Sequence, residues 1–355
     1  MEERATVLMA SLREIGAKHG LLAGCAVVVR RLKDNPAYAA LVAQQAGIIV
    51  EENALKFGPL RPSPTDFYFD DADALFDFAA KHDMKVRGHN FVWHRQIPKW
   101  FEGYVTKDNA EQVLVSHIER VGGRYAGRVH SWDVANEVIQ IKDGLPGGFR
   151  DSPWQKVLGD PGKGPGIVPA YMEIVYRAAR RVDPKALLFY NDYGIEGPDP
   201  QSDAKRKAVM DLLRAMKARG IPLDGLGVQS HLSASKSWGQ AETAGLRAMI
   251  AEARTMGLKV MITEMDVNDR DLPSDIPTRD HAVAKTYGDY LHQVLADPCV
   301  IGLLTWGISD KYTWLNGEDN RKDGQPERCL PFDADFKPKE AFAAEIRTVQ
   351  GRGNS

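Results

Sequence analysis

The chain has 355 residues, of which 43% are hydrophobic and 26% are charged, and its formal net charge is −2. These values are ordinary for a globular protein with a large core, and they exclude a disordered chain. The near-neutral charge lacks the basic excess with which proteins bind nucleic acids or anionic membranes. We therefore expect neither nucleic acid nor a membrane as a partner, and a ligand that is neutral or small.

The start of the chain predicts a helix. No apolar run reaches the length of about 18 residues that a membrane-spanning helix needs. Residues 1–20 mix acidic and basic side chains at helical spacing, which predicts an amphipathic helix over about 2–20 and shows no signal peptide. The expected location is secreted or periplasmic, with the leader absent from this numbering. A cytoplasmic location fits the same pattern.

The three cysteines, Cys25, Cys299 and Cys329, show no CxxC spacing. We predict that they pack as thiols, with a Cys299–Cys329 bridge as the alternative.

Short apolar runs alternate along the chain with longer segments of helical period, which is typical of βα units around a parallel sheet. In chain order, the predicted strands are 21–29, 46–51, 84–91, 129–135, 186–191, 223–230, 258–264 and 300–306. The predicted helices that follow include 71–82, 109–125, 169–182, 203–219, 241–256, 278–295 and a closing helix over about 338–349. Eight strands with their helices predict a single (β/α)8 TIM barrel domain over residues 1–355.

Barrels of this kind carry their functional residues after the C-terminal ends of the strands. The sequence has polar or aromatic groups at seven of these positions. They are Glu52 and Asn53 (second strand), His89 to Gln96 (third), Asn136 and Glu137 (fourth), Asn191 and Asp192 (fifth), Gln229 to His231 (sixth), Glu264 to Asp266 (seventh) and Trp306 (eighth). Fold maintenance alone does not explain so many functional groups at one end, so we predict a site there.

Two of these residues, Glu137 and Glu264, favour the cleavage of a glycosidic bond. Cleavage through a covalent intermediate needs one carboxyl that donates a proton and one ionised carboxylate that attacks the sugar. A single glutamate at a strand end is usually an ordinary polar residue, but the neighbours here favour a catalytic pair. Asn136 can bond the sugar 2-hydroxyl. Strand alternation can place His231 between Glu264 and Asp266, where it would lower the pKa of Glu264.

The remaining candidates suit a sugar, whose ring presents hydroxyl groups at its edge and apolar C–H faces. The predicted substrate-binding residues are Glu52, Asn53, Lys56, His89, Trp93, Gln96, Gln229, Trp306 and Trp314. Tryptophans are more often core residues, which is our interpretation of Trp100, Trp132, Trp154 and Trp238.

Six ordered motifs identify a family. They are Glu52-Asn-Ala-Leu-Lys-Phe57, Arg87-Gly-His-Asn-Phe-Val-Trp-His-Arg-Gln96, Trp132-Asp-Val-Ala-Asn-Glu137, Gln229-Ser-His231, Thr263-Glu-Met-Asp266 and Thr305-Trp-Gly307. Together they resemble the motifs of glycoside hydrolase family 10, the endo-β-1,4-xylanases, over residues 21 to about 346. Any one of these motifs would be weak, but six in order are specific.

The resemblance implies a retaining enzyme with Glu137 as acid/base and Glu264 as nucleophile, their carboxyl groups about 5–5.5 Å apart. It implies xylan and xylo-oligosaccharides as substrates, with no cofactor and no metal, and we expect a monomer. It also implies that Gln96 and Trp314 crowd the position where glucose carries its hydroxymethyl group. Two departures from the motifs, Phe57 in place of Trp and Asn90-Phe91 in place of Thr-Leu, predict a slightly altered glycone side. A third departure, Cys25, is interpreted as a packing residue.

Three other functions compete with this interpretation. A metal-dependent hydrolase needs a His-x-His pair near the first strand, which has none, and His89 and His94 should face opposite sides of one strand. A carbohydrate-binding barrel without catalysis is a minor hypothesis, since both glutamates are present. A related retaining glycosidase that acts on β-glucan or mannan is the stronger alternative, because it would share both glutamates.

Overall fold

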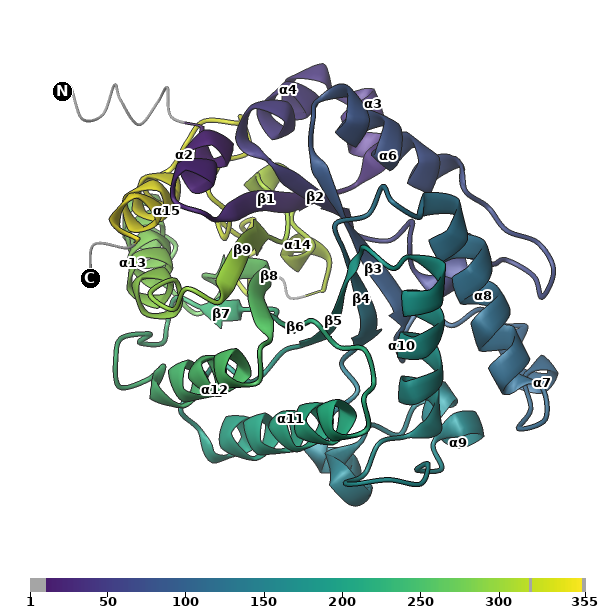
Figure 1. Ribbon diagram of the computed structural model, residues 1–355. Coiled ribbons are helices and arrows are strands. Elements are labelled where there is room, and N and C mark those ends of the chain that lie inside the picture. Colours follow the sequence, from purple (N-terminus) through teal and green to yellow (C-terminus); the bar gives the residue numbers. More distant parts are fainter. Residues whose placement is uncertain (1–10, 319–320, 353–355) are drawn as a thin grey trace.

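The computed structural model describes residues 11–318 and 321–352. In this part of the chain, eight parallel strands close into a barrel (Figure 1). The barrel strands are β1 (Leu22–Val27), β2 (Ile48–Glu51), β3 (Lys85–Val92), β4 (Ser131–Asn136), β5 (Leu187–Asp192), β6 (Gly225–Val228), β8 (Lys259–Asn268) and β9 (Val300–Thr305). Neighbours in this order are hydrogen-bonded, and the pairing of β1 with β9 closes the ring. A short extra strand, β7 (His231–Ser233), pairs with the end of β8.

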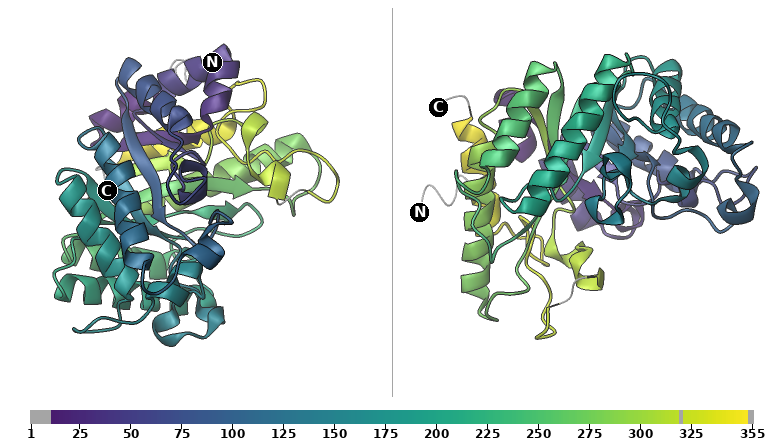
Figure 2. Two further views of the ribbon diagram at one scale, coloured as in Figure 1. Left: turned by 90° about the vertical axis from the view of Figure 1, so that its right-hand side faces the viewer. Right: turned by 90° about the horizontal axis from the view of Figure 1, so that it is seen from below.

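Helices surround the barrel on its outer side (Figure 2). The helices of the described residues are α2 (Leu12–Lys18), α3 (Val29–Asp34), α4 (Pro36–Gln45), α5 (Phe57–Leu60), α6 (Asp70–Lys81), α7 (Phe101–Tyr104), α8 (Ala110–Tyr125), α9 (Pro153–Leu158), α10 (Ala170–Val182), α11 (Pro200–Ala218), α12 (Ala244–Thr255), α13 (Ile276–Val294), α14 (Leu315–Glu318) and α15 (Glu340–Gly351). Short 3-10 turns lie at Ile141–Asp143, Pro146–Gly148 and Asp310–Tyr312.

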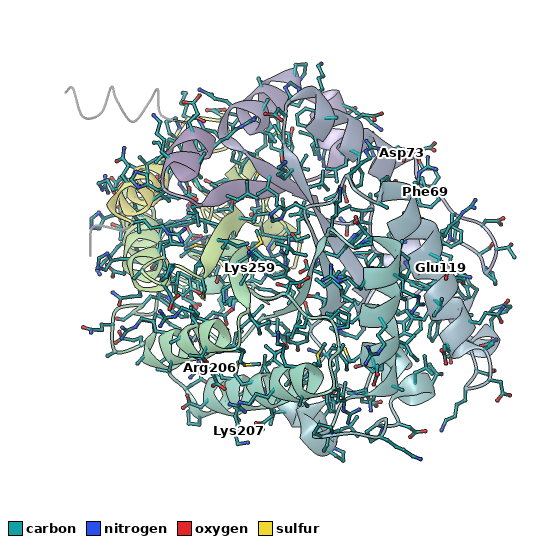
Figure 3. All side chains as sticks on the ribbon, in the orientation of Figure 1. Phe69, Asp73, Glu119, Arg206, Lys207 and Lys259 are labelled. Carbon is teal, nitrogen blue, oxygen red and sulfur yellow. The ribbon has the colours of Figure 1, made fainter. Side chains whose placement is uncertain are left out.

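Local sequence explains where several helices begin. The Asp199 side chain accepts hydrogen bonds from the first backbone N–H groups of α11, and Pro200 follows as the first helical residue. Asp275 caps α13 in the same way. Exposed charged side chains, such as Glu119 on α8 and Lys207 on α11, project outward from the helices (Figure 3).

The centre of the barrel combines apolar packing with one buried ion pair. Phe189 and Met261 belong to a buried cluster of strand residues. The Arg87 guanidinium lies 4.9 Å from the centre of the Phe189 ring and pairs with the carboxylate of Asp133, both side chains being 1% exposed. Because an unpaired charge here would be very costly, this pair ties β3 to β4 directly beneath the strand ends.

The predicted fold is confirmed. All eight predicted strands and all seven predicted helices are present, with ends shifted by a few residues. The sixth strand is shorter than the predicted 223–230, because Ser230 adopts a left-handed backbone (φ 64°) that interrupts the strand before β7. Of the helix expected over about 2–20, the structure shows Leu12–Lys18; residues 1–10 lie outside the described residues.

The cysteines are free thiols, as predicted, so the alternative Cys299–Cys329 bridge is wrong. Among the described helices, none has the length and apolar character required to cross a membrane.

Candidate active site

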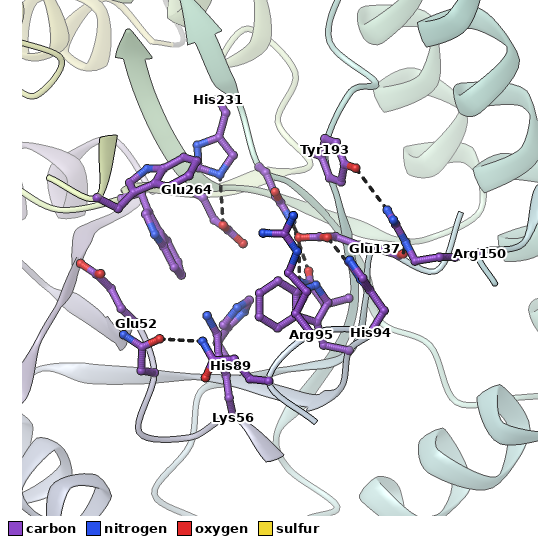
Figure 4. A pocket seen from close by; sticks show the side chains of 17 residues that line it. Glu52, Lys56, His89, His94, Arg95, Glu137, Arg150, Tyr193, His231 and Glu264 are labelled. Atoms are coloured by element: carbon purple, nitrogen blue, oxygen red, sulfur yellow. Dashed lines mark hydrogen bonds and ion pairs between the residues drawn. The ribbon is translucent and has the colours of Figure 1, made fainter. Parts of the chain in front are cut away.

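The C-terminal ends of the strands surround an open cleft of about 480 Å³ (Figure 4). It is lined by Glu52, Asn53, Lys56, His89, Trp93, His94, Arg95, Gln96, Asn136, Glu137, Arg150, Tyr193, Gln229, His231, Glu264, Trp306 and Trp314. Both predicted catalytic glutamates and all nine predicted substrate-binding residues are therefore brought together. Asp266 lies behind the cleft wall, where it contacts His231.

Glu264 lies on β8 and is held by two side chains. Asn191 Nδ2 donates to its Oε1 at 2.7 Å, and His231 Nε2 lies 3.3 Å from its Oε2. Burial alone would raise the pKa of Glu264, but the hydrogen bond from His231 and the nearby His89 outweigh burial, so the pKa lies below its usual value. Glu264 is consequently ionised at neutral pH, as a nucleophile must be.

His231 links Glu264 to a second carboxylate. Its Nδ1 lies 3.0 Å from Asp266 Oδ1, so the ring stands between the two acids, as strand alternation predicted. Burial would lower the pKa of His231, but Asp266 and Glu264 raise it well above its usual value. The ring is therefore an imidazolium that donates a hydrogen bond to each carboxylate.

The Glu264-bound amide of Asn191 is oriented by its other contacts. Thr263 Oγ1 donates to Asn191 Oδ1 at 2.7 Å, which fixes the amide so that Nδ2 faces both Glu264 and, at 2.8 Å, Asn136 Oδ1. Sequence reasoning placed Asn191 at a strand end but assigned it no role. Its position at the end of the fifth predicted strand was the available signal.

Glu137 follows β4 in a left-handed conformation (φ 56°), which is uncommon for a residue other than glycine. Its backbone N–H donates to Asn191 O at 2.9 Å, and its carbonyl oxygen accepts from Arg150 Nε at 2.7 Å. Its Oε1 accepts from Gln229 Nε2 at 3.1 Å and from Asn136 Nδ2 at 3.2 Å. The side chain is thereby aimed at the cleft by contacts at both its backbone and its carboxyl group.

The surroundings of Glu137 differ from those of Glu264. Burial would raise the pKa of Glu137, but the hydrogen bond from Gln229 and the charge of Arg150 hold it below its usual value. His94 Nδ1 lies 3.6 Å from Glu137 Oε2, and burial together with Arg150 lowers the pKa of His94 to about 4. The neutral His94 ring therefore adds no charge at pH 7, and both glutamates are ionised in the free protein.

One wall of the cleft presents hydrogen-bonding groups beside aromatic faces. Gln96 Nε2 donates to Asn53 Oδ1 at 2.8 Å, and Lys56 Nζ lies 4.5 Å from the ring centre of Trp93. Burial lowers the pKa of Lys56. Burial and the adjacent Glu51 raise the pKa of Glu52 to about 8, so at pH 7 this carboxyl group is protonated and can donate a hydrogen bond.

Two further residues of this wall are fixed from behind. His89 Nδ1 lies 2.9 Å from the Asp133 carboxylate, which also pairs with Arg87. Trp314 Nε1 donates to Asp266 Oδ2 at 2.7 Å. Asp266 therefore orients both the imidazolium behind Glu264 and the Trp314 ring.

Four residues that line the cleft were given no role from the sequence, although His94 and Arg95 belong to the predicted polar segment His89 to Gln96; the other two are Arg150 and Tyr193. Tyr193 directly follows β5, so its position was an available signal, and Arg150 belongs to the loop after β4. The prediction that His89 and His94 face opposite sides of one strand is wrong, because β3 ends at Val92 and both rings line the cleft. Within the described residues, no three His, Cys, Asp or Glu side chains are grouped to hold a metal ion.

The departures noted in the sequence lie behind the cleft. Phe57 is buried and packs against His117, with ring centres 4.2 Å apart, and against Trp154 at 5.4 Å. It does not line the cleft, and neither do the buried Asn90 and Phe91. These substitutions change packing rather than the lining surface, so the expected change of shape on the glycone side is absent from the lining residues.

Comparison with known proteins places these residues in a family. Residues 11–348 match the family model described as glycosyl hydrolase family 10. The chain is 34% identical to endo-1,4-beta-xylanase 2 of Claviceps purpurea over 310 residues, which cover 87% of this chain and 82% of that protein. It is 30% identical to exoglucanase XynX of Acetivibrio thermocellus over 90% of this chain, but spans only 28% of that longer protein.

Among solved structures, the chain is similar to xylanase 10B from Thermotoga petrophila RKU-1 in complex with xylobiose. The TM-score is 0.84 and the sequence identity 30%, over 96% of this chain and 97% of that one.

Proposed function

Because the chain belongs to glycosyl hydrolase family 10, we propose that it is a retaining endo-1,4-β-xylanase that hydrolyses internal bonds of xylan by double displacement. The observation that carries this proposal is the pair Glu137 and Glu264, which share one hydrogen-bond network but have unlike surroundings. Retention requires their carboxyl groups to lie about 5–5.5 Å apart.

In the first step, Glu137 protonates the glycosidic oxygen while Glu264 attacks the anomeric carbon and forms a covalent glycosyl ester. The C–O bond to the leaving sugar breaks, and that sugar departs with the proton. The lowered pKa of Glu264 favours the attacking carboxylate. The bound sugar excludes further water from the surroundings of Glu137. This exclusion raises the pKa of Glu137, so that the side chain holds a proton.

In the second step, Glu137 acts as base toward a water molecule that hydrolyses the ester. Formation of the ester removes the negative charge of Glu264, whose repulsion had opposed ionisation of Glu137. The hydrogen bond from Gln229 and the charge of Arg150 then favour the ionised form of Glu137. The same residue thus serves as acid and then as base, because the charge of its neighbour changes between the steps.

The substrate preference is proposed from Gln96 and Trp314, which line the cleft. Asn53 accepts a hydrogen bond from Gln96, and Asp266 accepts one from Trp314, and these bonds favour the observed positions of both side chains. Xylose lacks the hydroxymethyl group of glucose, and crowding at this wall would favour xylose by a few kcal/mol at most. We propose Asn136 as the partner of the sugar 2-hydroxyl and the remaining lining residues predicted from the sequence as hydroxyl and ring contacts.

We further propose that the chain acts as a single-domain monomer without a cofactor. The last helix, α15, contacts both α13 and α2. This supports the single domain, because the contact joins the C-terminal part of the chain to its first described helix. A polysaccharide cannot enter a cell, which supports a secreted or periplasmic location. Light scattering of the purified chain tests the monomer.

The function is tested by digesting xylan and cellulose side by side while proton NMR follows the anomeric configuration of the first products. We expect faster release from xylan and β-products before mutarotation. The Glu264→Gln variant should be inactive with an unchanged circular dichroism spectrum, because the change is nearly isosteric. First products of α-configuration would contradict retention, and faster turnover of cellulose would favour the β-glucan alternative suggested by the similarity to exoglucanase XynX.

A further inference from the structure

A buried lysine on the outer helix layer contacts the groups that hold Glu137. Lys205 lies on α11, its side chain is 6% exposed, and it is absent from the residues that line the cleft. Its Nζ is 2.7 Å from Asp192 Oδ1 and 3.9 Å from the ring centre of Tyr193. A lysine placed here cannot touch a sugar, but it fixes a residue that can.

Tyr193 is held at two points by the Lys205–Asp192 pair. Its backbone N–H donates to Asp192 Oδ1 at 2.9 Å, and its ring lies over the Lys205 ammonium. A cation that is removed from water is attracted to the electron-rich face of an aromatic ring. The Asp192 carboxylate is itself fixed by the Tyr190 hydroxyl. The pair therefore determines where the Tyr193 hydroxyl lies.

That hydroxyl is the contact point for Arg150. Arg150 Nη2 donates to Tyr193 Oη at 3.2 Å, while Nε of the same guanidinium donates to the carbonyl oxygen of Glu137. The planar guanidinium transmits a shift at one nitrogen to the other, because its donors are in a fixed arrangement. Figure 4 shows Arg150 reaching Tyr193 on the Glu137 side of the cleft.

Glu137 needs such support because its backbone is strained. A non-glycine residue in the left-handed region persists only where the surroundings enforce that conformation. Relaxation of this turn would rotate the carboxyl group away from the glycosidic oxygen. Displacement by about 1 Å can reduce a rate by about 100-fold.

We propose that Lys205 is a positioning residue that acts through Tyr193 and Arg150 on the backbone of Glu137. This inference rests on the proposed role of Glu137 as acid/base. Lys205 affects proton donation to the leaving sugar, and it does not affect the attack by Glu264. The alternative is a structural role in which Lys205 only neutralises Asp192.

The two roles differ in their dependence on the leaving group. We would compare kcat/KM, which reports the first step, for xylohexaose, whose sugar leaving group needs protonation, and for 2,4-dinitrophenyl xylobioside, whose leaving group does not. Lys205→Met should lower kcat/KM for xylohexaose by about 10-fold and kcat/KM for the activated substrate by less than about 2-fold. The alkaline limb of kcat/KM should move to higher pH, because Arg150 no longer stays near Glu137.

Tyr193→Phe provides a second variant that keeps the ring over Lys205 but removes the hydroxyl that contacts Arg150. It should show the same dependence on the leaving group, and the double variant Lys205→Met/Tyr193→Phe should show no further loss, because both changes interrupt one chain of contacts. Lys207→Met is the matched control. It removes an exposed lysine of the same helix, paired with Asp211 at the surface, and should match the wild type on both substrates.

Equal losses on the two substrates, additive effects in the double variant, or an unchanged alkaline limb would overturn the proposal. If Lys205→Met does not fold, Tyr193→Phe decides alone, and wild-type behaviour of that variant on both substrates would refute it. Failure of the proposed function gives a different result. In that case Glu137→Gln itself would lower kcat/KM equally for both substrates, or for neither of them.

Discussion

Glu345 on α15 should make the protein less stable as the pH rises. Its side chain is 1% exposed, and neither carboxyl oxygen has a hydrogen-bond partner among the described residues. Burial raises the pKa of Glu345 to about 8. It borders a cavity of about 10 Å³ between α15, β1 and β9, which is room for about one water molecule. We predict that Glu345→Gln stabilises the fold at neutral and alkaline pH.

The magnitude follows from the raised pKa. The unfolded chain releases the Glu345 proton near pH 4.5, whereas the folded chain retains it until about pH 8. Below pH 4.5 both states are protonated, so the residue adds no pH-dependent cost. Between these values the free energy of unfolding falls by about 1.4 kcal/mol per pH unit, which amounts to about 3 kcal/mol at pH 7. For 355 residues, with an unfolding entropy of about 2.1 cal/mol/K per residue, this corresponds to about 4 °C.

The assay is calorimetric or circular dichroism melting of both proteins at pH 4.5, 6, 7 and 8. Glu345→Gln should melt close to the wild type at pH 4.5, and the gain in Tm should grow steadily to pH 8. Glu340→Gln, which changes a more exposed glutamate of the same helix, is the control and should show no such trend. A difference in Tm that stays constant across these pH values would refute the reasoning, because Glu345 would then ionise equally in both states.

Three further predictions concern the cleft. Asn191→Ala should lower kcat by about 100-fold and move the acidic limb of the pH profile to higher pH, because Glu264 loses a hydrogen bond to its charged form; an unshifted limb would contradict this. The lowered pKa of Glu137 means that kcat/KM should decline with rising pH earlier than kcat, since the free enzyme loses the acid proton first; profiles of both parameters on xylohexaose check this. Trp314→Phe should raise the ratio of activity on aryl cellobiosides to aryl xylobiosides several-fold, and an unchanged ratio would remove Trp314 from the selection of xylose.

The barrel and most of the cleft could be predicted from the sequence because both depend on short-range patterns. Strand alternation was sufficient to place His231 between Glu264 and Asp266, since residues two apart on a strand share a face. Strand ends converge in a parallel barrel, which brought residues as distant as Glu52 and Trp314 to one cleft.

The remainder depends on where strands stop and how loops return. His94 was misplaced because strand alternation was applied to a residue beyond the end of β3 at Val92, although the predicted strand 84–91 stops one residue before that end. Arg150 and Tyr193 meet only because two loops fold toward each other. The lowered pKa of Glu137 could not be predicted either, because it depends on contacts with residues far away in the chain, such as the hydrogen bond from Gln229.

The double contact of Asp266 has a practical consequence for redesign. One of its oxygens supports the imidazolium behind Glu264, and the other accepts a hydrogen bond from the Trp314 indole, which is proposed to contact the sugar. Anyone who widens the groove by altering Trp314 also changes the charge balance at the reactive centre. Broader substrate acceptance and undiminished turnover are therefore difficult to obtain together in this scaffold without a replacement donor for that carboxylate oxygen.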